Sequence, residues 1–576
     1  GSEMCGIAGI KVSENSPLKG HDIASEVNSL LRAIAHRGPD ANQVETIDDL
    51  CLGHVRLSIL DLDARSNQPF RCYETGLVLS YNGEIYNYLE LRSKLESLGV
   101  EFKTSSDTEV LLEMWKAEGA SCLGKLNGMF AFAIYDPRDS SLVLARDRFG
   151  IKPLYYRHLG EANDLMFCST PMPLASWGNV RQSLNLQALS EYLHYGASLG
   201  EQTVFDGIYQ LLPGHMMKVS RGCTQTSSFT QMNFVEAKTR PVSKQETKDL
   251  IESAIVRQLR SDVPLGVLLS GGLDSSIITA VASQYSSGIK TFTAVFEDGG
   301  EANEHEIAAI VANKYKTDHQ EVYVSQLDSA YAVDKVIDAF GMPFGDPAAI
   351  PLMSLYERMS ESVSVVLQGD GGDELFGGYD RYVRAHYFPT PLRLSPPFYG
   401  VVESIIDGCL SLPGINPRLI RNFKSLLAKD TAQFATTIMD QDIPGWSIQS
   451  LLHQDVSAEL RNVKYGRRYE ELIEELEEAF PSATKASRAS ISLYLDKQVI
   501  LPDVYLPKVD RTSMFYSLEA RVPFLDNDLM QRMSLQDPSY LLKGMQTKAF
   551  LREVFARDLP SEVLDGRKKG FGAPVD

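Results

Sequence analysis

The chain has 576 residues and a formal net charge of −19, with 44% hydrophobic and 23% charged residues. This length exceeds what one hydrophobic core supports, so two or more domains are expected. The acidic balance argues against a nucleic-acid surface, which needs a basic footprint. Because no apolar run has the length of a membrane span and no secretory signal opens the chain, we expect a cytoplasmic protein without membrane contact.

Residues 1–3 precede Met4 and are interpreted as the remnant of an expression tag. The native chain would then begin at Met4, and removal of Met4 would make Cys5 the first residue. Residues 4–219 contain short β-type runs separated by turn residues, which predicts a layered antiparallel sheet domain. The clearest of these runs are residues 77–81, 130–135 and 141–145.

Residues 220–243 are polar and predict a linker, and the pattern changes after them. From 244 to 576, buried strands alternate with helices, which predicts an α/β domain with a parallel sheet and a helical C-terminal part. The predicted strands are residues 263–269, 290–296 and 363–367, and the predicted helices include residues 277–282 and 469–480.

A glycine loop with the sequence Ser-Gly-Gly-Leu-Asp-Ser-Ser follows the first of these strands, at residues 270–276. Two glycines and a helix N-terminus bring backbone N–H groups to an anion, which favours a phosphate. Asp274 inside an anion site predicts a shared cation, most simply Mg²⁺. The plain alternative is a glycine turn before a helix, but the whole heptad resembles the loop of enzymes that split ATP into AMP and pyrophosphate.

A second glycine loop, residues 368–378, follows the strand predicted at 363–367 and contains Asp370, Asp373 and Glu374. Loops at the carboxyl ends of parallel strands meet at one edge of the sheet, where ligands bind. We therefore predict that Asp274 and Asp373 hold one Mg²⁺ on the phosphates of ATP. Helix caps with solvated acids explain a single aspartate here, but not the whole cluster.

Cys5 is a candidate nucleophile because of its place next to Met4. An N-terminal cysteine carries its own base, since its α-amine has a pKa of about 8 and accepts the thiol proton. A structural cysteine at the start of a strand is the alternative, and it would be preferred if Cys5 stood alone.

Four further residues fit glutamine chemistry around that thiol. Arg56 can hold a substrate carboxylate, and Asp107 can hold its ammonium. Asn82 and Gly83 can donate a side-chain amide and a backbone N–H to an oxyanion. Taken singly, Arg56 and Asp107 would be interpreted as surface charges, so the prediction depends on the combination.

The motifs together resemble the glutamine-dependent asparagine synthetase family, in which a class II glutamine amidotransferase domain is fused to an ATP-pyrophosphatase-type synthetase domain. The resemblance covers essentially the whole chain and is carried by residues 5–7, 36–40, 82–87, 146–156, 270–276 and 518–526. It implies an N-terminal-nucleophile hydrolase with an αββα sandwich, hydrolysis of glutamine through a thioester, and passage of ammonia inside the protein to a carboxylate activated with ATP, usually that of aspartate.

The resemblance also implies roles for individual residues. Asp370 would lie near the acyl-adenylate and the incoming ammonia, and Lys569 would stabilise charge on the phosphate. Glu84 would join the glutamine site. The residues expected to contact ATP are Leu268, Ser270, Gly271, Gly272, Asp274, Ser275, Ser276, Gln368 and Gly369.

The chain departs from the family pattern near the expected acceptor site. Relatives commonly have Asp-Glu before Pro343, where this chain has Gly341-Met342, and a hydroxyl residue is replaced after Asp346-Pro347. Amidation of another carboxylate, such as a sugar acid, a peptide or a natural-product intermediate, therefore stays open beside asparagine synthesis. Intramolecular ring closure is disfavoured because the glutamine-site residues are intact, and a catalytically silent scaffold is disfavoured because Cys5, Asp274 and Lys569 are present. A homodimer is compatible with the sequence.

Overall fold

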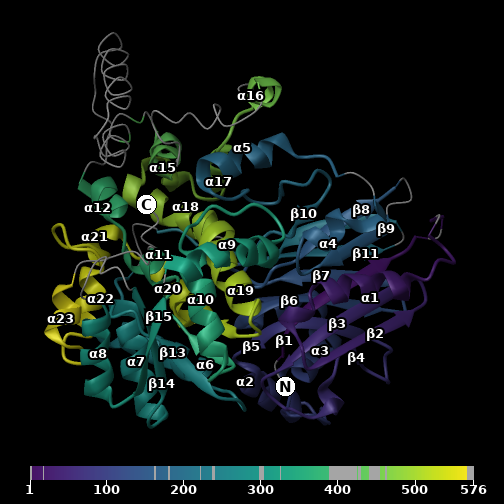
Figure 1. Ribbon diagram of the computed structural model, residues 1–576, viewed down its shortest axis with the longest axis horizontal. Coiled ribbons are helices and arrows are strands. Elements are labelled where there is room, and N and C mark those ends of the chain that lie inside the picture. Colours follow the sequence, from purple (N-terminus) through teal and green to yellow (C-terminus); the bar gives the residue numbers. More distant parts are fainter. Residues whose placement is uncertain are drawn as a thin grey trace.

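The computed structural model describes residues 3–13, 15–16, 18–160, 164–179, 182–220, 222–231, 233–235, 240–296, 304–324, 326–387, 425, 428, 430–439, 454–460 and 463–566. A β-rich first domain and an α/β second domain lie side by side, with the helices of the C-terminal part above the second sheet (Figure 1).

The first domain contains two antiparallel layers of six strands each, joined by a single bridge between Glu3 and Gly83. The first layer has the order β2 (Ala41–Ile47), β3 (Leu50–Ser58), β1 (Glu3–Lys11), β9 (Asp164–Cys168), β8 (Tyr155–Leu159), β10 (Tyr209–Gln210). The second has the order β4 (Phe70–Arg71), β5 (Val78–Ile85), β6 (Gly128–Asp136), β7 (Ser141–Arg146), β11 (His215–Ser220), β12 (Cys223–Ser228).

Alternate residues of these strands face opposite sides, as the period of a strand requires. Ile7 of β1 and Val78 of β5 lie in one buried cluster between the two layers. Ala8 instead packs toward α1 (Ile23–Ala33), and Tyr81 packs toward the helices over the other layer. Those helices are α2 (Tyr88–Ser97) and α3 (Asp107–Glu118), and the domain also has α4 (Met172–Ala175) and α5 (Leu186–Tyr195). The predicted αββα sandwich is confirmed.

The second domain is built on a parallel five-stranded sheet, as predicted. Its order is β15 (Asp318–Val324), β14 (Lys290–Phe296), β13 (Leu265–Leu268), β16 (Val365–Leu367), β17 (Glu519–Arg521). From β13 the chain proceeds to β14 and β15 on one side and later returns to β16 on the other. The point between β13 and β16 is therefore a topological switch point, where α/β proteins bind ligands.

Helices cover both faces of this sheet. One face packs against α6 (Lys244–Gln258), α7 (Leu273–Tyr285) and α8 (Glu304–Tyr315), and the other against α10 (Ala349–Ser360) and α19 (Leu506–Met514). The remaining described helices are α9 (Gln326–Phe340), α11 (Gly372–Phe376), α12 (Asp380–Tyr387), α15 (Thr431–Met439), α16 (Gln454–Leu460), α17 (Arg467–Ala479), α18 (Arg488–Gln498), α20 (Asn527–Met533), α21 (Pro538–Leu541), α22 (Ala549–Val554) and α23 (Ser561–Asp565). A short π-helical turn, Leu501–Tyr505, precedes α19.

One boundary differs from the sequence prediction. Strand β12 lies inside the stretch 220–243 that was expected to be a linker, and it pairs with β11 at the edge of its layer. Alternating threonines, Thr224 and Thr226, suit an exposed edge strand although the segment is polar throughout. In the described part of the chain, no helix has the length and apolar character needed to cross a membrane.

Candidate active sites

The first candidate site surrounds Cys5 on strand β1. Cys5 is buried, and its register partner across the antiparallel ladder to β3 is Arg56. The backbone N of Cys5 donates to Asn82 Oδ1 at 3.1 Å, so strand β5 of the other layer also meets the thiol residue. The structure therefore brings together three of the residues predicted for glutamine chemistry.

Asn82 is oriented by this contact. A backbone N–H only donates, so Oδ1 of Asn82 faces Cys5 and the side-chain amide Nδ2 faces away. Nδ2 is buried and has no hydrogen-bond partner among the described residues. A buried donor without a partner is costly, which favours a bound acceptor such as a substrate oxygen.

Gly83, the second predicted oxyanion donor, is required by close packing. A Cβ at this position would lie 2.1 Å from the carbonyl oxygen of Met129 on β6. No side chain is accommodated at that distance, so glycine is the residue that lets strand β5 pass beside β6 here.

Asp107, at the first turn of α3, is buried below the end of β5. Its Oδ2 accepts hydrogen bonds from Tyr81 Oη at 2.8 Å and from Ile85 N at 2.9 Å. Its Oδ1 has no hydrogen-bond partner among the described residues. Burial raises the pKa of Asp107 to about 6, so the carboxylate gains from a bound cation such as a substrate ammonium.

The side chains of Arg56 and Glu84 have structural contacts that the sequence did not predict. Arg56 donates from Nη1 to the carbonyl of Asp63 at 3.1 Å and from Nη2 to that of Asp61 at 2.9 Å, which shapes the loop beside Cys5. Glu84 Oε2 lies 3.3 Å from Nη2 of Arg521 in the second domain, with both side chains buried. Burial raises the pKa of Glu84 well above its ordinary value, although Arg521 opposes this shift. The Glu84 carboxylate thus belongs to the domain interface, and its predicted part in binding glutamine would involve the backbone.

The second candidate site lies at the switch point between β13 and β16. Leu268 ends β13, and the predicted phosphate loop leads into the N-terminus of α7. Gly271 has φ +79°, and a Cβ there would lie 2.5 Å from the carbonyl oxygen of Glu304. The loop is thus held close to the first turn of α8, in the left-handed conformation that lets backbone N–H groups point to an anion.

The two glycine loops meet at Asp274. A Cβ on Gly369 would lie 2.7 Å from Cβ of Asp274, and one on Gly372 would lie 2.8 Å from its Cγ. Ser270 and Ser275 are joined within the first loop, since Ser270 N donates to Ser275 Oγ at 3.2 Å. Ser276 Oγ is buried and has no hydrogen-bond partner among the described residues.

Lys548 is the residue that sequence reasoning missed. Its ammonium forms ion pairs with Asp274 and with Asp373 Oδ1, the latter at 2.6 Å. Asp274 and Asp373, which were predicted to hold Mg²⁺, do lie together, and in this structure both pair with the ammonium of Lys548. Lys548 is the N-cap residue of α22, where a cation opposes the helix dipole, and its two ion pairs with Asp274 and Asp373 compensate this.

Asp274 and Asp373 nonetheless fit a magnesium ion. Carboxylate oxygens are the ligands that Mg²⁺ prefers, and Asp274 Oδ1 has no hydrogen-bond partner among the described residues. Two carboxylates alone do not complete an octahedral shell, so phosphate oxygens and water would supply the rest. No cluster of three or more His, Cys, Asp or Glu side chains suited to a metal occurs in the described ranges.

Gln368 and Asp370 follow β16 and border the same site. Gln368 Oε1 accepts from Tyr356 Oη at 2.6 Å, while its Nε2 is buried without a hydrogen-bond partner among the described residues. Asp370 acts electrostatically on Lys508 of α19, whose ammonium pairs with Asp346 at 2.7 Å. Burial lowers the pKa of Lys508, but these two carboxylates outweigh it and the net shift is upward. Lys569, predicted to act on the phosphate, lies outside the described residues.

The Gly341-Met342 departure lies against the first domain. Gly341 has φ +63°, and a Cβ there would lie 3.0 Å from Cβ of Met172. Met342 packs against the apolar cluster beneath α1, and Gly345 N donates to the carbonyl of Gly196 at 2.7 Å. Packing between the domains thus accounts for these two residues, whereas Asp346 and Asp370 both act on Lys508.

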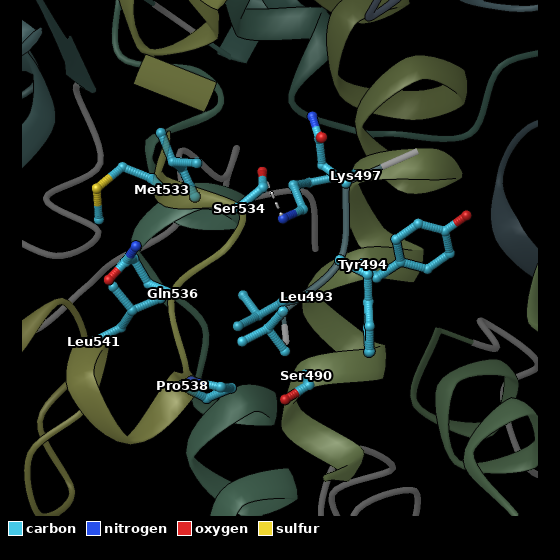
Figure 2. Close-up of a pocket in the computed structure, with 13 residues that line it drawn as sticks. Ser490, Leu493, Tyr494, Lys497, Met533, Ser534, Gln536, Pro538 and Leu541 are labelled. Atoms are coloured by element: carbon cyan, nitrogen blue, oxygen red, sulfur yellow. Dashed lines mark hydrogen bonds between the residues drawn. The ribbon is translucent and has the colours of Figure 1, made fainter. Parts of the chain in front are cut away.

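A separate small cavity lies between α18 and the segment that joins α20 to α21. Its lining includes Lys497, which donates to Ser534 Oγ at 3.0 Å (Figure 2). The cavity volume is about 10 Å³, which accommodates one water molecule. Burial lowers the pKa of Lys497 to about 8, but the space excludes a substrate.

An N-terminal-nucleophile αββα domain beside a parallel-sheet domain with paired glycine loops defines a two-domain glutamine amidotransferase. Comparison with known families agrees. A sequence model described as glutamine amidotransferase domain matches residues 4–230, and one described as asparagine synthase matches residues 246–576. The chain belongs to the asparagine synthase family, whose members are carbon–nitrogen ligases that use glutamine and ATP.

Curated relatives match over most of their length. Asparagine synthetase [glutamine-hydrolyzing] 1 of Bacillus subtilis is 32% identical over 99% of this chain and 87% of its own. A putative asparagine synthetase [glutamine-hydrolyzing] 2 of Methanocaldococcus jannaschii is 32% identical over 78% of this chain and 91% of its own. Amidase chyE of Penicillium rubens is 26% identical over 99% of this chain and 89% of its own.

Proposed function

We propose that this protein makes asparagine from aspartate, glutamine and ATP, with release of AMP and pyrophosphate. The observation that supports this most directly is the meeting of the two glycine loops at Asp274, beside Lys548, at the switch point of the parallel sheet. That arrangement suits a nucleotide whose phosphates need both N–H donors and cations.

In the first half-reaction, Cys5 Sγ attacks the side-chain carbonyl carbon of glutamine, and the α-amine of a chain that begins at Cys5 takes the thiol proton. The oxyanion accepts from Asn82 Nδ2 and from the backbone N–H of Gly83, while Asp107 holds the substrate ammonium. Ammonia leaves with that proton, and water hydrolyses the thioester to glutamate and free thiol.

In the second half-reaction, the β-carboxylate of aspartate attacks the α-phosphorus of ATP, and pyrophosphate leaves. The first glycine loop and Lys548 hold the phosphates, and Lys569 is proposed to stabilise their charge. Mg²⁺ held by Asp274 and Asp373 would neutralise charge on the departing pyrophosphate. Ammonia then attacks the acyl carbon near Asp370, and AMP leaves. Passage of ammonia within the protein keeps it away from water and protonation.

Pyrophosphate release tests the proposal, with ammonium chloride and ATP supplied to a panel of carboxylates. We expect aspartate to support release together with formation of asparagine. Cys5→Ala should abolish glutamine-supported synthesis and leave ammonia-supported synthesis within about twofold, because the thiol acts only in the first half-reaction. Loss of both activities in Cys5→Ala would contradict the two-site scheme.

The same family chemistry on another carboxylate is the second candidate. The similarity to a protein named as an amidase supports it. If another acid gives pyrophosphate and a new amide while aspartate is inert, the acceptor in the proposal is wrong and the scheme for glutamine and ATP stands.

A further inference from the structure

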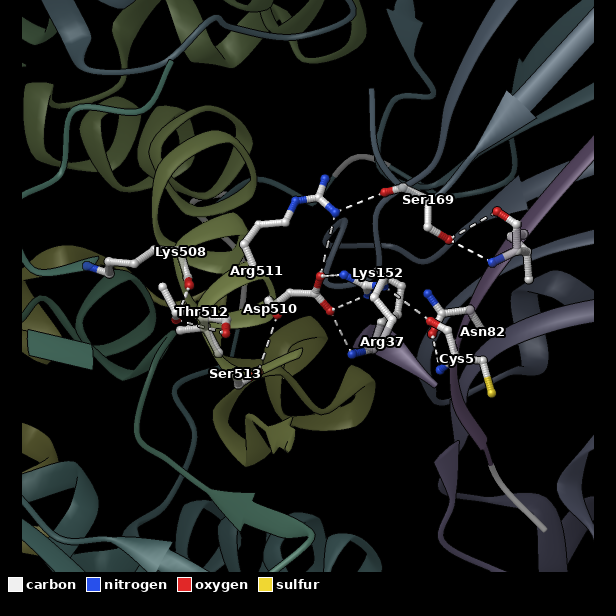
Figure 3. Close-up of polar contacts among 12 residues, drawn as sticks. Cys5, Arg37, Asn82, Lys152, Ser169, Lys508, Asp510, Arg511, Thr512 and Ser513 are labelled. Atoms are coloured by element: carbon white, nitrogen blue, oxygen red, sulfur yellow. Dashed lines mark hydrogen bonds and ion pairs between the residues drawn. The ribbon is translucent and has the colours of Figure 1, made fainter. Parts of the chain in front are cut away.

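A buried ionic cluster joins the two domains at the first turns of α19. The two terminal nitrogens of Arg37 donate to the Asp510 carboxylate, Nη1 at 3.0 Å and Nη2 at 3.2 Å (Figure 3). Lys152 Nζ lies 3.0 Å from the same carboxylate. The side chains of Arg37 and Lys152 are each 1% exposed and that of Asp510 is 2% exposed. One carboxylate of the second domain thus compensates two buried cations of the first, and Arg511 of its own helix lies 3.9 Å from the same carboxylate.

The cluster reaches the nucleophile through Arg37. Its Nε donates to the backbone carbonyl of Cys5 at 3.3 Å, so the guanidinium lies between Cys5 and Asp510. The turn that carries Arg37 is also held by α19 and its C-terminal end, because Ser517 Oγ donates to the carbonyl of His36 at 2.7 Å and Phe515 packs on the His36 ring.

We propose that Asp510 is a positioning residue for Cys5, acting through Arg37, so that the synthetase domain completes the glutaminase site. This inference rests on the proposed role of Cys5 as the nucleophile. Without Asp510, the Arg37 guanidinium is left buried beside Lys152 with no anion to fix its orientation. The carbonyl of Cys5 then loses a fixed hydrogen-bond donor, and a misplacement of the reacting thiol on the order of 1 Å costs about 10²-fold in rate.

Asp503 provides a matched control for damage to the interface. It is a second buried aspartate at the domain boundary, and it accepts from Gly200 N at 2.8 Å and from Gln210 Nε2 at 3.0 Å. None of its recorded contacts reaches Arg37 or Cys5. Asp503→Asn therefore makes the same carboxyl-to-amide substitution at the interface without touching the proposed link.

The test compares glutamate release from glutamine with ammonia-supported pyrophosphate release, in full chains processed to begin at Cys5. We expect Asp510→Asn to lower kcat for glutamine about 10- to 100-fold with KM within about threefold. Arg37→Lys keeps the charge and the pairing with Asp510 but loses the Nε donor, and should lower kcat similarly. Ammonia-supported rates should stay within about twofold, and Asp503→Asn should keep kcat for glutamine within about threefold.

Three further measurements complete the test. If Asp510 acts through Arg37, the two losses should not add. The double variant Arg37→Lys/Asp510→Asn should then have a kcat for glutamine within about threefold of that of the slower single variant. Asp510→Glu, which keeps the charge, should recover most of the lost kcat. Wild-type glutamine kinetics in either Asp510→Asn or Arg37→Lys overturns the inference, as does an equal loss in Asp503→Asn. Absence of ammonia-supported turnover in the unmodified protein would instead contradict the proposed synthetase reaction, since glutamate release measures the Asp510 link independently.

Discussion

Replacing Lys548 with methionine perturbs the point at which both glycine loops converge. The lysine side chain is 6% exposed and lies 2.6 Å from Asp373, and it also pairs with Asp274. At an effective dielectric constant of about 20, Coulomb's law gives an attraction of about 6 kcal/mol for the 2.6 Å pair, much of which desolvation offsets. The two carboxylates are each 14% exposed, so leaving them without their cation should cost less than the roughly 3–5 kcal/mol of a fully buried pair, about 2 kcal/mol locally.

The catalytic effect should be separable from that loss. The role proposed above for Lys548, a cation that stabilises charge on the transferring phosphates, is worth about 10²- to 10³-fold in rate. Lys548→Met should therefore lower ammonia-supported pyrophosphate release by that factor, while glutamate release from glutamine stays within about threefold. Lys543→Met is the control, because Lys543 is exposed and pairs only with Glu553 among its recorded contacts. Retention of synthetase activity within threefold in Lys548→Met would refute the role of this lysine.

Three further outcomes are expected at the glutaminase site. Because burial raises the pKa of Asp107 to about 6, its carboxylate is protonated as the pH falls through that value, and KM for glutamine should rise about tenfold per unit below it. Asp107→Asn should raise KM at pH 8 by about 30- to 100-fold and remove this pH dependence, measured by glutamate release. Gly83→Ala places a Cβ 2.1 Å from the carbonyl oxygen of Met129, so glutamine turnover should be lost while ammonia-supported turnover persists. Circular dichroism checks that the variant remains folded. A chain that retains residues 1–4 should turn over glutamine at least about 100-fold more slowly than one starting at Cys5, checked by mass, because its Cys5 nitrogen is an amide and no base.

The sequence allowed the prediction of a layered antiparallel sheet in the first domain and of the parallel sheet because their signals are local, whereas the αββα arrangement was implied by the family resemblance. Strand β14 has the predicted bounds, Lys290–Phe296, since its β-branched and aromatic residues are typical of a strand. Strand β17 could not be predicted in this way. It has three residues, two of them charged, and its placement comes from pairing with β16 and from ion pairs in the interface.

The site residues likewise fall into those that a local motif predicts and those that only long-range contacts reveal. Cys5, Asn82 and Asp107 were predicted from motifs, and the structure places Asn82 on Cys5 and Asp107 below the same strand end. Lys548 and Asp510 were missed because their meaning lies in contacts across long sequence separations. Lys548 lies 274 residues from Asp274, and Asp510 lies 473 residues from Arg37. No periodicity or spacing within a segment reports such pairs.

Arg521 belongs to the motif segment 518–526, although it takes part in neither proposed reaction. Its guanidinium reaches Glu84, the residue after Gly83, and donates to the carbonyl of Gln258 at 2.7 Å. Its own carbonyl accepts from the backbone N of Gln368, at the edge of the nucleotide site, at 2.9 Å. One buried residue thus fixes strand β17 against both the oxyanion strand and the second glycine loop. Arg521 has 0% side-chain exposure, and Glu84 of the first domain covers one side of its guanidinium, so separation of the domains would expose this buried cation and remove its contact with the oxyanion strand.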